Sequence, residues 1–309
     1  MTVYEAFSAD PAQPLRPPQR EEDSGHRFDE TRHWAAFLSL GFEARQEREQ
    51  TITRMTRIRH QGPLRVQRPF YPEGKTGCCH VYLLHPPGGL VSGDALKIDV
   101  AVGPNAHSLV TTPAATKLYK ADSNGVAWGQ HTTLNVAKDG VLEYLPQETL
   151  AFNGSKGEQT TTIELATGAK CIGWEVLALG RPVGNLPFVT GHLEQRFSLH
   201  IDGKPVWLER QILDPTHARF NGKWGQGGAT VQATLWVVGL DDETGAIEVI
   251  RAQLPESKNW AITRRRGVVL LRYLGNKRNE AWAICQQAWE LLRPLLTGHS
   301  AVVPRIWLT

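Results

Sequence analysis

Between about residue 50 and residue 182, short apolar or alternating runs are separated by turn signals built from Gly, Pro and Asp. The runs recur at roughly ten-residue spacing, without a helical period between them. They lie at residues 57–70, 79–87, 94–104, 107–113, 129–140, 141–146, 159–168 and 170–182. Strands that follow one another without intervening helices favour a mainly β architecture over an alternating α/β one.

The clearest hairpin covers residues 196–213. Apolar residues alternate with polar ones on both sides of the turn signal Asp202-Gly203. The alternating apolar positions are Phe197, Leu199, Ile201, Val206 and Leu208. The same period places Trp207 and Glu209 together on one face of the second strand, and Leu208 and Arg210 on the other.

A helical period appears late in the chain, over residues 279–298. Its apolar stripe consists of Ala281, Ile284, Cys285, Ala288, Leu291, Leu292 and Leu295. Asn279 is the expected N-cap, Gly298 the expected stop, and Pro294 should end or kink the helix near its last turn. Residues 242–254 form a weaker helical candidate, preceded by a loop over residues 221–230.

Composition adds limits to this picture. Residues 1–32 are rich in Pro and charge without periodicity, which predicts a poorly ordered arm ahead of a single domain over residues 33–309. The chain has 34 Lys plus Arg against 31 Asp plus Glu, and a net charge of +3 gives no argument for nucleic acid or an anionic membrane. Four cysteines without a CxxC pair, no signal-type segment and no apolar run of membrane length indicate a cytoplasmic protein.

Residues 83–96, LLHPPGGLVSGDAL, resemble a phosphate-binding loop only in their glycines. The spacing is GGxxxGD, a β-type run follows, and Asp94 stands where a P-loop has its lysine. A tight corner between strands is the better interpretation. In the nearby Cys78-Cys79-His80, extended geometry would place Cys78 and His80 on one face, but four ligands with zinc spacing are not present.

Two carboxylates interrupt apolar runs. Glu175 lies within CIGWEVLALG and Glu209 within VWLERQIL, where a charge is costly unless it is paired or faces a wet cavity. A salt bridge, for instance with Arg181 or Arg210, or an exposed strand face would also explain them. Residues 111–120, TTPAATKLYK, either line a polar channel or finish a strand and turn. The chain has no G-x-S-x-G elbow and no HExxH motif.

Seven blocks, in order along the chain, closely resemble the urease accessory protein family UreD, called UreH in some species. They are residues 62–74, 79–94, 111–120, 142–152, 173–182, 208–213 and 292–309. The resemblance covers residues 55–309, is strongest in the middle third, and is loose over residues 214–280. It implies an irregular, β-helix-like stacked-sheet body with about two helices, one of them near the C-terminus.

The resemblance also implies a non-enzymatic role in urease maturation. Members of this family bind UreF, and through it the GTPase UreG, and dock on apo-urease. Nickel is expected in transit through an internal tunnel, with no permanently bound cofactor. The residues that match tunnel positions are Asp94, Thr116, Glu175 and Glu209, with Thr112, Lys117, Tyr119, Arg181 and Arg210 as interior polar residues and Cys79 and His80 as accessory contacts. Oxygen ligands suit transit because they hold a borderline divalent ion weakly.

This sequence departs from the family pattern at two positions that bear on the expected nickel tunnel. Glu175 stands where relatives can have a shorter Asp, and Cys78 adds an unexpected thiol beside Cys79. Two alternatives to nickel transit also stay open. The chain could be a scaffold only, with nickel travelling outside it, or an all-β hydrolase or lyase that uses Glu175 and Glu209 as acid and base.

Overall fold

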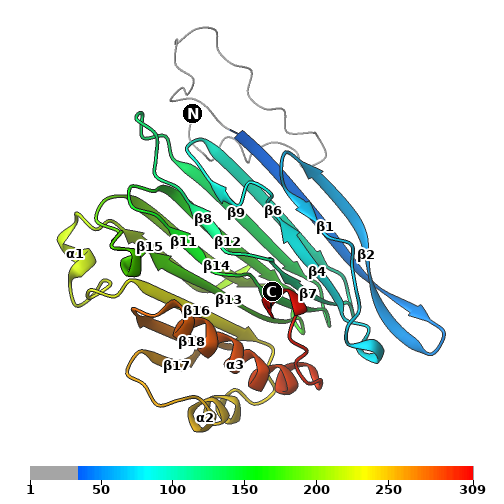
Figure 1. Cartoon of the computed structure of the whole chain (residues 1–309). Helices are drawn as coiled ribbons and strands as arrows, with labels where there is room; N and C mark the ends of the chain where they lie inside the picture. Colours follow the sequence, from blue (N-terminus) through cyan, green and yellow to red (C-terminus); the bar gives the residue numbers. More distant parts are fainter. Residues whose placement is uncertain (1–33, 309) are drawn as a thin grey trace.

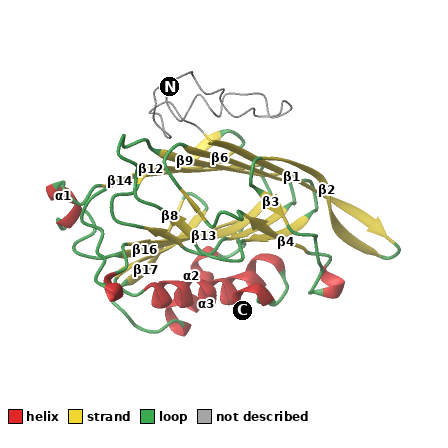
Figure 2. Ribbon diagram, turned by 45° about the horizontal axis from the view of Figure 1, so that its top comes forward, coloured by secondary structure: helices red, strands yellow, loops and turns green. Residues whose placement is uncertain are grey.

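The computed structural model describes residues 34–308 as two β-sheets stacked face to face, with two helices on the outer side of the second sheet (Figures 1 and 2). The first sheet contains β1 (Trp34–Glu47), β2 (Gln50–Gln61), β6 (Asp94–Val102), β9 (Trp128–Val136), β12 (Lys156–Leu165), β14 (His192–Ile201) and β15 (Lys204–Leu213). The expected arm over residues 1–32 lies outside the described residues.

The second sheet is larger. Its main path contains β3 (Arg65–Val66), β4 (Cys79–Leu84), β7 (His107–Thr111), β10 (Val141–Leu145), β13 (Lys170–Leu179), β16 (Val231–Val238), β17 (Trp260–Arg265) and β18 (Val268–Gly275). The short strands β5 (Gly89–Leu90), β8 (Thr116–Leu118) and β11 (Thr149–Ala151) pair alongside it. The helices are α1 (Ala218–Asn221), α2 (Glu243–Gln253) and α3 (Arg278–Thr297), with 3-10 turns at Gly74–Thr76, Pro182–Gly184 and Arg305–Leu308.

The chain alternates between the sheets from β6 through β7, β9, β10, β12 and β13 to β14, as in a two-sheeted β-helix. Successive strands within each sheet are therefore parallel. In the first sheet, for example, Val100 pairs with Leu134, Leu134 with Ile163 and Ile163 with Leu199. The predicted stacked-sheet architecture is confirmed. The repeat escapes notice in the sequence because successive turns share only alternating polarity.

Two apolar cores lie on the two faces of the second sheet. Side chains such as Cys171, Leu177 and Leu179 fill the space between the sheets. Ile172 and Trp174, from the same strand, pack instead under α2 and α3. Because both faces of β13 are covered, its sequence is nearly continuously apolar. Among the described residues, no helix is long and apolar enough to cross a membrane.

The predicted hairpin is β14 and β15. Asp202 and Gly203 both have left-handed backbone angles, with φ of 50° and 72°, as a two-residue hairpin turn requires. A register shift near Leu199 leaves Trp207 and Glu209 facing inward, so they share a face as predicted. Leu208 does not extend the apolar face of the first strand, because this shift turns it outward, where it is 64% exposed.

The predicted late helix is α3, and the weaker candidate is α2. Lys277, not Asn279, occupies the N-cap of α3, and it makes no capping hydrogen bond through its side chain. The helix ends at Thr297 with Gly298 as its cap, one turn beyond Pro294. Leu295 is exposed, whereas Trp289 and Arg293 are buried. The buried face of α3 therefore differs from the predicted stripe: it includes Trp289 and Arg293, which belong to a buried polar cluster, and leaves out Leu295.

Candidate interior polar site

Two cavities lie between the sheets and meet at Glu175 and Gln195, which line both of them. The first has a volume of about 100 Å³ and is also lined by Thr112, Thr116 and Tyr144. The second has a volume of about 40 Å³ and is also lined by Trp207, Glu209 and Trp236. Three of the four residues matched to a tunnel from the sequence, Thr116, Glu175 and Glu209, therefore lie along one continuous interior region.

Glu175 is the carboxylate at the junction of the cavities. It points inward from β13 and accepts a short hydrogen bond from the Thr161 hydroxyl of β12 in the facing sheet. Burial is the main cause that raises the pKa of Glu175 to about 7, and the nearby Glu209 carboxylate adds to it. Within residues 34–308, Glu175 forms no ion pair. It can therefore change its charge near neutral pH.

The second carboxylate has a different environment. Glu209 of β15 accepts two hydrogen bonds from Arg272 of β18, one of them 3.0 Å long. The Arg272 guanidinium also lies 5.7 Å from the centre of the Trp207 ring. Arg210, the partner suggested by the sequence, lies on the opposite face and pairs with Glu194. One end of the second cavity thus has a paired carboxylate, and its junction with the first has an unpaired one.

The glycine-rich corner does not place Asp94 at the cavities. The Asp94 carboxylate accepts a hydrogen bond of 2.8 Å from the Val91 backbone and so holds the turn between them. It is not among the residues that line the two interior cavities. A side chain at Gly89 would come within 2.4 Å of the Lys117 carbonyl oxygen, so this corner needs a glycine for close packing.

Of the remaining predicted interior residues, only Thr112 lines one of the two cavities, and Arg181 and Arg210 are exposed rather than interior. Thr112 accepts a hydrogen bond of 2.8 Å from the Gln147 backbone beside the first cavity. Lys117 lies in β8, next to Gly89 of β5. Tyr119 and Arg181 contact the same ring, Phe152, at 5.3 Å between ring centres and 4.8 Å from the guanidinium carbon.

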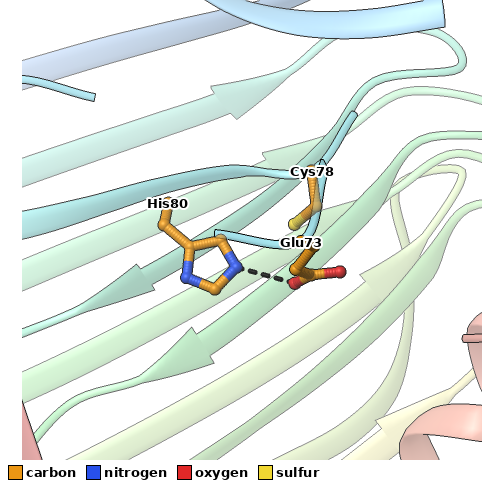
Figure 3. A group of neighbouring side chains, drawn as sticks. All are labelled: Glu73, Cys78 and His80. Carbon is orange, nitrogen blue, oxygen red and sulfur yellow. Dashed lines mark hydrogen bonds and ion pairs between the residues drawn. The ribbon is translucent and has the colours of Figure 1, made fainter. Parts of the chain in front are cut away.

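A second polar cluster lies on the other face of the second sheet, beneath α3. Cys78 and His80 share a face there, as predicted, with Glu73 beside them (Figure 3). Cys79 faces the core between the sheets instead, so it does not share a site with His80. Cys78 also lies near His107 and Glu143, which completes a second group of possible metal ligands.

Arg293 of α3 occupies the centre of this cluster. Its guanidinium lies 2.6 Å from Glu73 and 2.9 Å from Glu143, and all three side chains are essentially inaccessible. His80 bonds Glu73 and His107 bonds Glu143, each at 2.7 Å. Any divalent ion would compete with Arg293 for the same carboxylate oxygens. The arrangement fits a buried ion network better than a metal site.

The same contacts shift the pKa values of the groups in this cluster. Burial alone would raise the pKa of Glu73, but hydrogen bonds from His80 and Arg293 bring it down to about 2. The pKa of Glu143 is also lowered, despite burial, by His107 and by the Arg293 charge. Burial and the two carboxylates raise the pKa of the Cys78 thiol well above its usual range. The thiol is thus protonated and a poor metal ligand at neutral pH.

Comparison with known proteins settles the family. The profile described as "UreD urease accessory protein" matches residues 35–308. The chain is 74% identical to "Urease accessory protein UreD" of Marinobacter nauticus, over 93% of this chain and 96% of that protein. It is 66% identical to the protein of the same name from Pseudoalteromonas translucida, over 93% and 95%. A protein of Brucella anthropi, "Urease accessory protein UreD 2", is 40% identical over 89% and 98%.

The chain belongs to the UreD urease accessory protein family. It is therefore an accessory protein of urease maturation and not itself an enzyme. The hypothesis that Glu175 and Glu209 are the acid and base of a hydrolase or lyase is therefore excluded.

Several polar residues of this site were missed at the sequence level. Gln195 lines both cavities, while Thr161 and Arg272 hold the lining carboxylates Glu175 and Glu209. Each lies on a strand at an inward position where an apolar residue would be expected. Period-two alternation alone could have placed them inward, but only the strand register brings them to one level of the sandwich.

Proposed function

We propose that this chain is a scaffold for urease maturation that conveys nickel through its interior. The single observation that carries the proposal is the junction of two polar cavities at Glu175, with Glu209 farther along the same region. Nickel(II) accepts oxygen ligands, and carboxylates with hydroxyls release it more readily than a set of thiolates would. A path of weak sites admits an ion and also lets it leave.

The partners in this proposal come from the family. The chain binds UreF, recruits UreG through UreF and docks on the urease structural subunits in the cytoplasm. Nucleic acid and membranes have no part in it. Nickel is the cargo of the chain and not a resident cofactor. Asp94, Lys117 and Tyr119 do not line the two cavities and serve turns and packing near this path, whereas the exposed Arg181 and Arg210 have no part in it.

The decisive experiment uses the purified assembly of this chain with UreF, UreG and apo-urease. Glu175→Gln keeps the size of the side chain and removes its charge, and it should slow nickel transfer to urease at least tenfold. Glu164→Gln is the matched control, since Glu164 of β12 lies outside both cavities and pairs with His200. Metal content of the re-isolated urease measures transfer, and size-exclusion chromatography verifies that the assembly is intact.

The scaffold-only alternative gives the opposite results. If nickel travels outside this chain, Glu175→Gln will load urease at the wild-type rate. Thr116→Trp, which fills part of the first cavity, will then also leave loading unchanged while partner binding persists. Normal transfer in both variants would refute interior transit.

A further inference from the structure

Four glutamines lie at the same level of the first sheet, side by side on adjacent strands. Gln130 of β9 pairs with Gln159 of β12, Gln159 with Gln195 of β14, and Gln195 with Gln211 of β15. Neighbouring strands are about 4.8 Å apart, so amides at paired positions are within reach of one another. Gln195 does donate a hydrogen bond of 3.3 Å to Gln159.

Gln232 of β16 joins this row from the facing sheet. Its amide nitrogen donates to Gln195 at 2.6 Å and to Gln211 at 2.8 Å. Its carbonyl oxygen accepts from Gln211 at 3.0 Å and from Gln226 at 2.6 Å. We call Gln130, Gln159, Gln195, Gln211 and Gln232 the amide ladder. It links the two sheets through side-chain amides alone.

The amide ladder follows both cavities. Gln130 and Gln159 line the first cavity, Gln195 lines both, and Gln211 and Gln232 line the second. The ladder therefore passes Glu175 and reaches the cavity that holds Glu209. Four residues farther along the same strands, the paired inward positions Leu134, Ile163 and Leu199 are apolar, whereas the level between them includes Thr132 and Thr161.

The five ladder residues are partly buried, and taking amides partly out of water costs free energy unless their polar atoms have partners. One atom beside them has none. Gln226 is 2% exposed and donates to Gln232, yet its carbonyl oxygen is buried without a partner among the described residues. Gln226 lines neither cavity, but its partner Gln232 lines the second, so an unfilled acceptor lies directly beside the ladder.

The second cavity is the narrower part of the interior path. Its volume of about 40 Å³ has room for roughly three water molecules. An ion in this narrow part lies beside the amide oxygens of Gln195, Gln211 and Gln232, which can replace part of its water.

We propose that the amide ladder binds a partly dehydrated divalent cation, with neutral carbonyl oxygens replacing lost water between Glu175 and Glu209. This inference rests on the proposed function, since it assigns the ligands along the interior path. Rotation about the last side-chain torsion turns an amide oxygen toward the ion. Each such turn breaks an amide to amide hydrogen bond, so binding is weak and reversible, as transfer requires.

The test uses the purified assembly with Ni²⁺ as the probe. The double variant Gln195→Met and Gln232→Met keeps the volume of the side chains but removes their oxygens. It should transfer nickel at least tenfold more slowly, with an unchanged far-UV spectrum and unchanged partner binding. Gln253→Met in the exposed part of α2 is the matched control and should behave as wild type.

A second variant is designed to strengthen nickel binding instead of weakening it. It also tests the inference if the double variant does not fold. Gln195→Glu adds a charged oxygen ligand, so equilibrium dialysis should show Ni²⁺ bound at least tenfold more tightly and transfer should slow. Wild-type affinity in Gln195→Glu would overturn the inference, as would wild-type transfer in a folded double variant. If Glu175→Gln still slows transfer in that event, interior transit survives and the ladder is a structural network only. Wild-type transfer in all three would refute both proposals.

Discussion

At the scale of single residues, the two interior carboxylates differ because of their neighbours. Glu209 has the Arg272 guanidinium, whereas Glu175 has only a hydroxyl donor from Thr161. Burial without a cation favours the protonated form of Glu175, which explains why its pKa rises to about 7. The sequence showed that both residues interrupt apolar runs, but it did not show which of them is paired.

The raised pKa of Glu175 predicts a dependence of folding stability on pH. Between its ordinary value of 4.5 and about 7, the folded chain holds a proton that the unfolded chain has lost, so stability falls as pH rises. Glu175→Gln removes this loss. Its stability relative to wild type should increase by up to about 3 kcal/mol from pH 4.5 to pH 7.5. Urea unfolding at both pH values measures the change.

Glu248→Gln, at an exposed position of α2, serves as the control for that comparison and should run parallel to wild type. If Glu175→Gln also runs parallel to wild type over this range, Glu175 is not held protonated by burial. The difference between the two proteins reports mainly Glu175, together with its coupling to the nearby Glu209 carboxylate.

At the scale of elements, local patterns predicted type and position well. Period-two alternation and a turn signal predicted the β14 to β15 hairpin, and a helical stripe ended by Gly298 predicted α3. The predictions that failed concern side chains whose orientation depends on tertiary contacts. Leu208 turns outward because of a register shift, and Leu295 yields its interior place to Arg293, whose partners lie far away in the sequence.

The candidate site was predictable to a similar extent. The embedded carboxylates Glu175 and Glu209 could be recognised from their apolar surroundings. The amide ladder could not, because a glutamine within one strand is unremarkable until parallel register aligns it with others. Asp94 was matched by its motif, yet its side chain holds a turn through Val91.

Close packing between neighbouring strands of the second sheet predicts a sensitive position in β13. A side chain at Gly173 would place its Cβ 2.5 Å from the Trp236 ring and 2.7 Å from the Tyr144 carbonyl oxygen. Gly173→Ala should therefore destabilise the protein by about 1–3 kcal/mol through overpacking. Gly184→Ala is the control, because nothing lies within 4 Å of its added Cβ. Equal urea midpoints for the two variants would contradict this account.

At the scale of the whole molecule, the buried ion network ties together parts of the chain that are distant in sequence. Arg293 of α3 bonds Glu73, which precedes β4, and Glu143 of β10. Its guanidinium also donates to the backbone carbonyl oxygen of Ser300, in the segment after α3. Helix, sheet and C-terminal segment therefore depend on one cation for their electrostatic balance.

Arg293→Leu should consequently be among the most damaging substitutions outside the cavities. It leaves two buried carboxylates without their cation, which costs about 3–5 kcal/mol of folding stability. The exposed pair of Arg45 with Glu43, 3.9 Å apart, offers the control, and Arg45→Leu should change stability by less than about 1 kcal/mol. Urea unfolding measures both effects.

Limited proteolysis should cut residues 299–308 faster in Arg293→Leu only, because the segment loses its anchor at Ser300. A stability within 1 kcal/mol of wild type would mean that the carboxylates regain partners or protons without Arg293, and the network would then not hold the layers together.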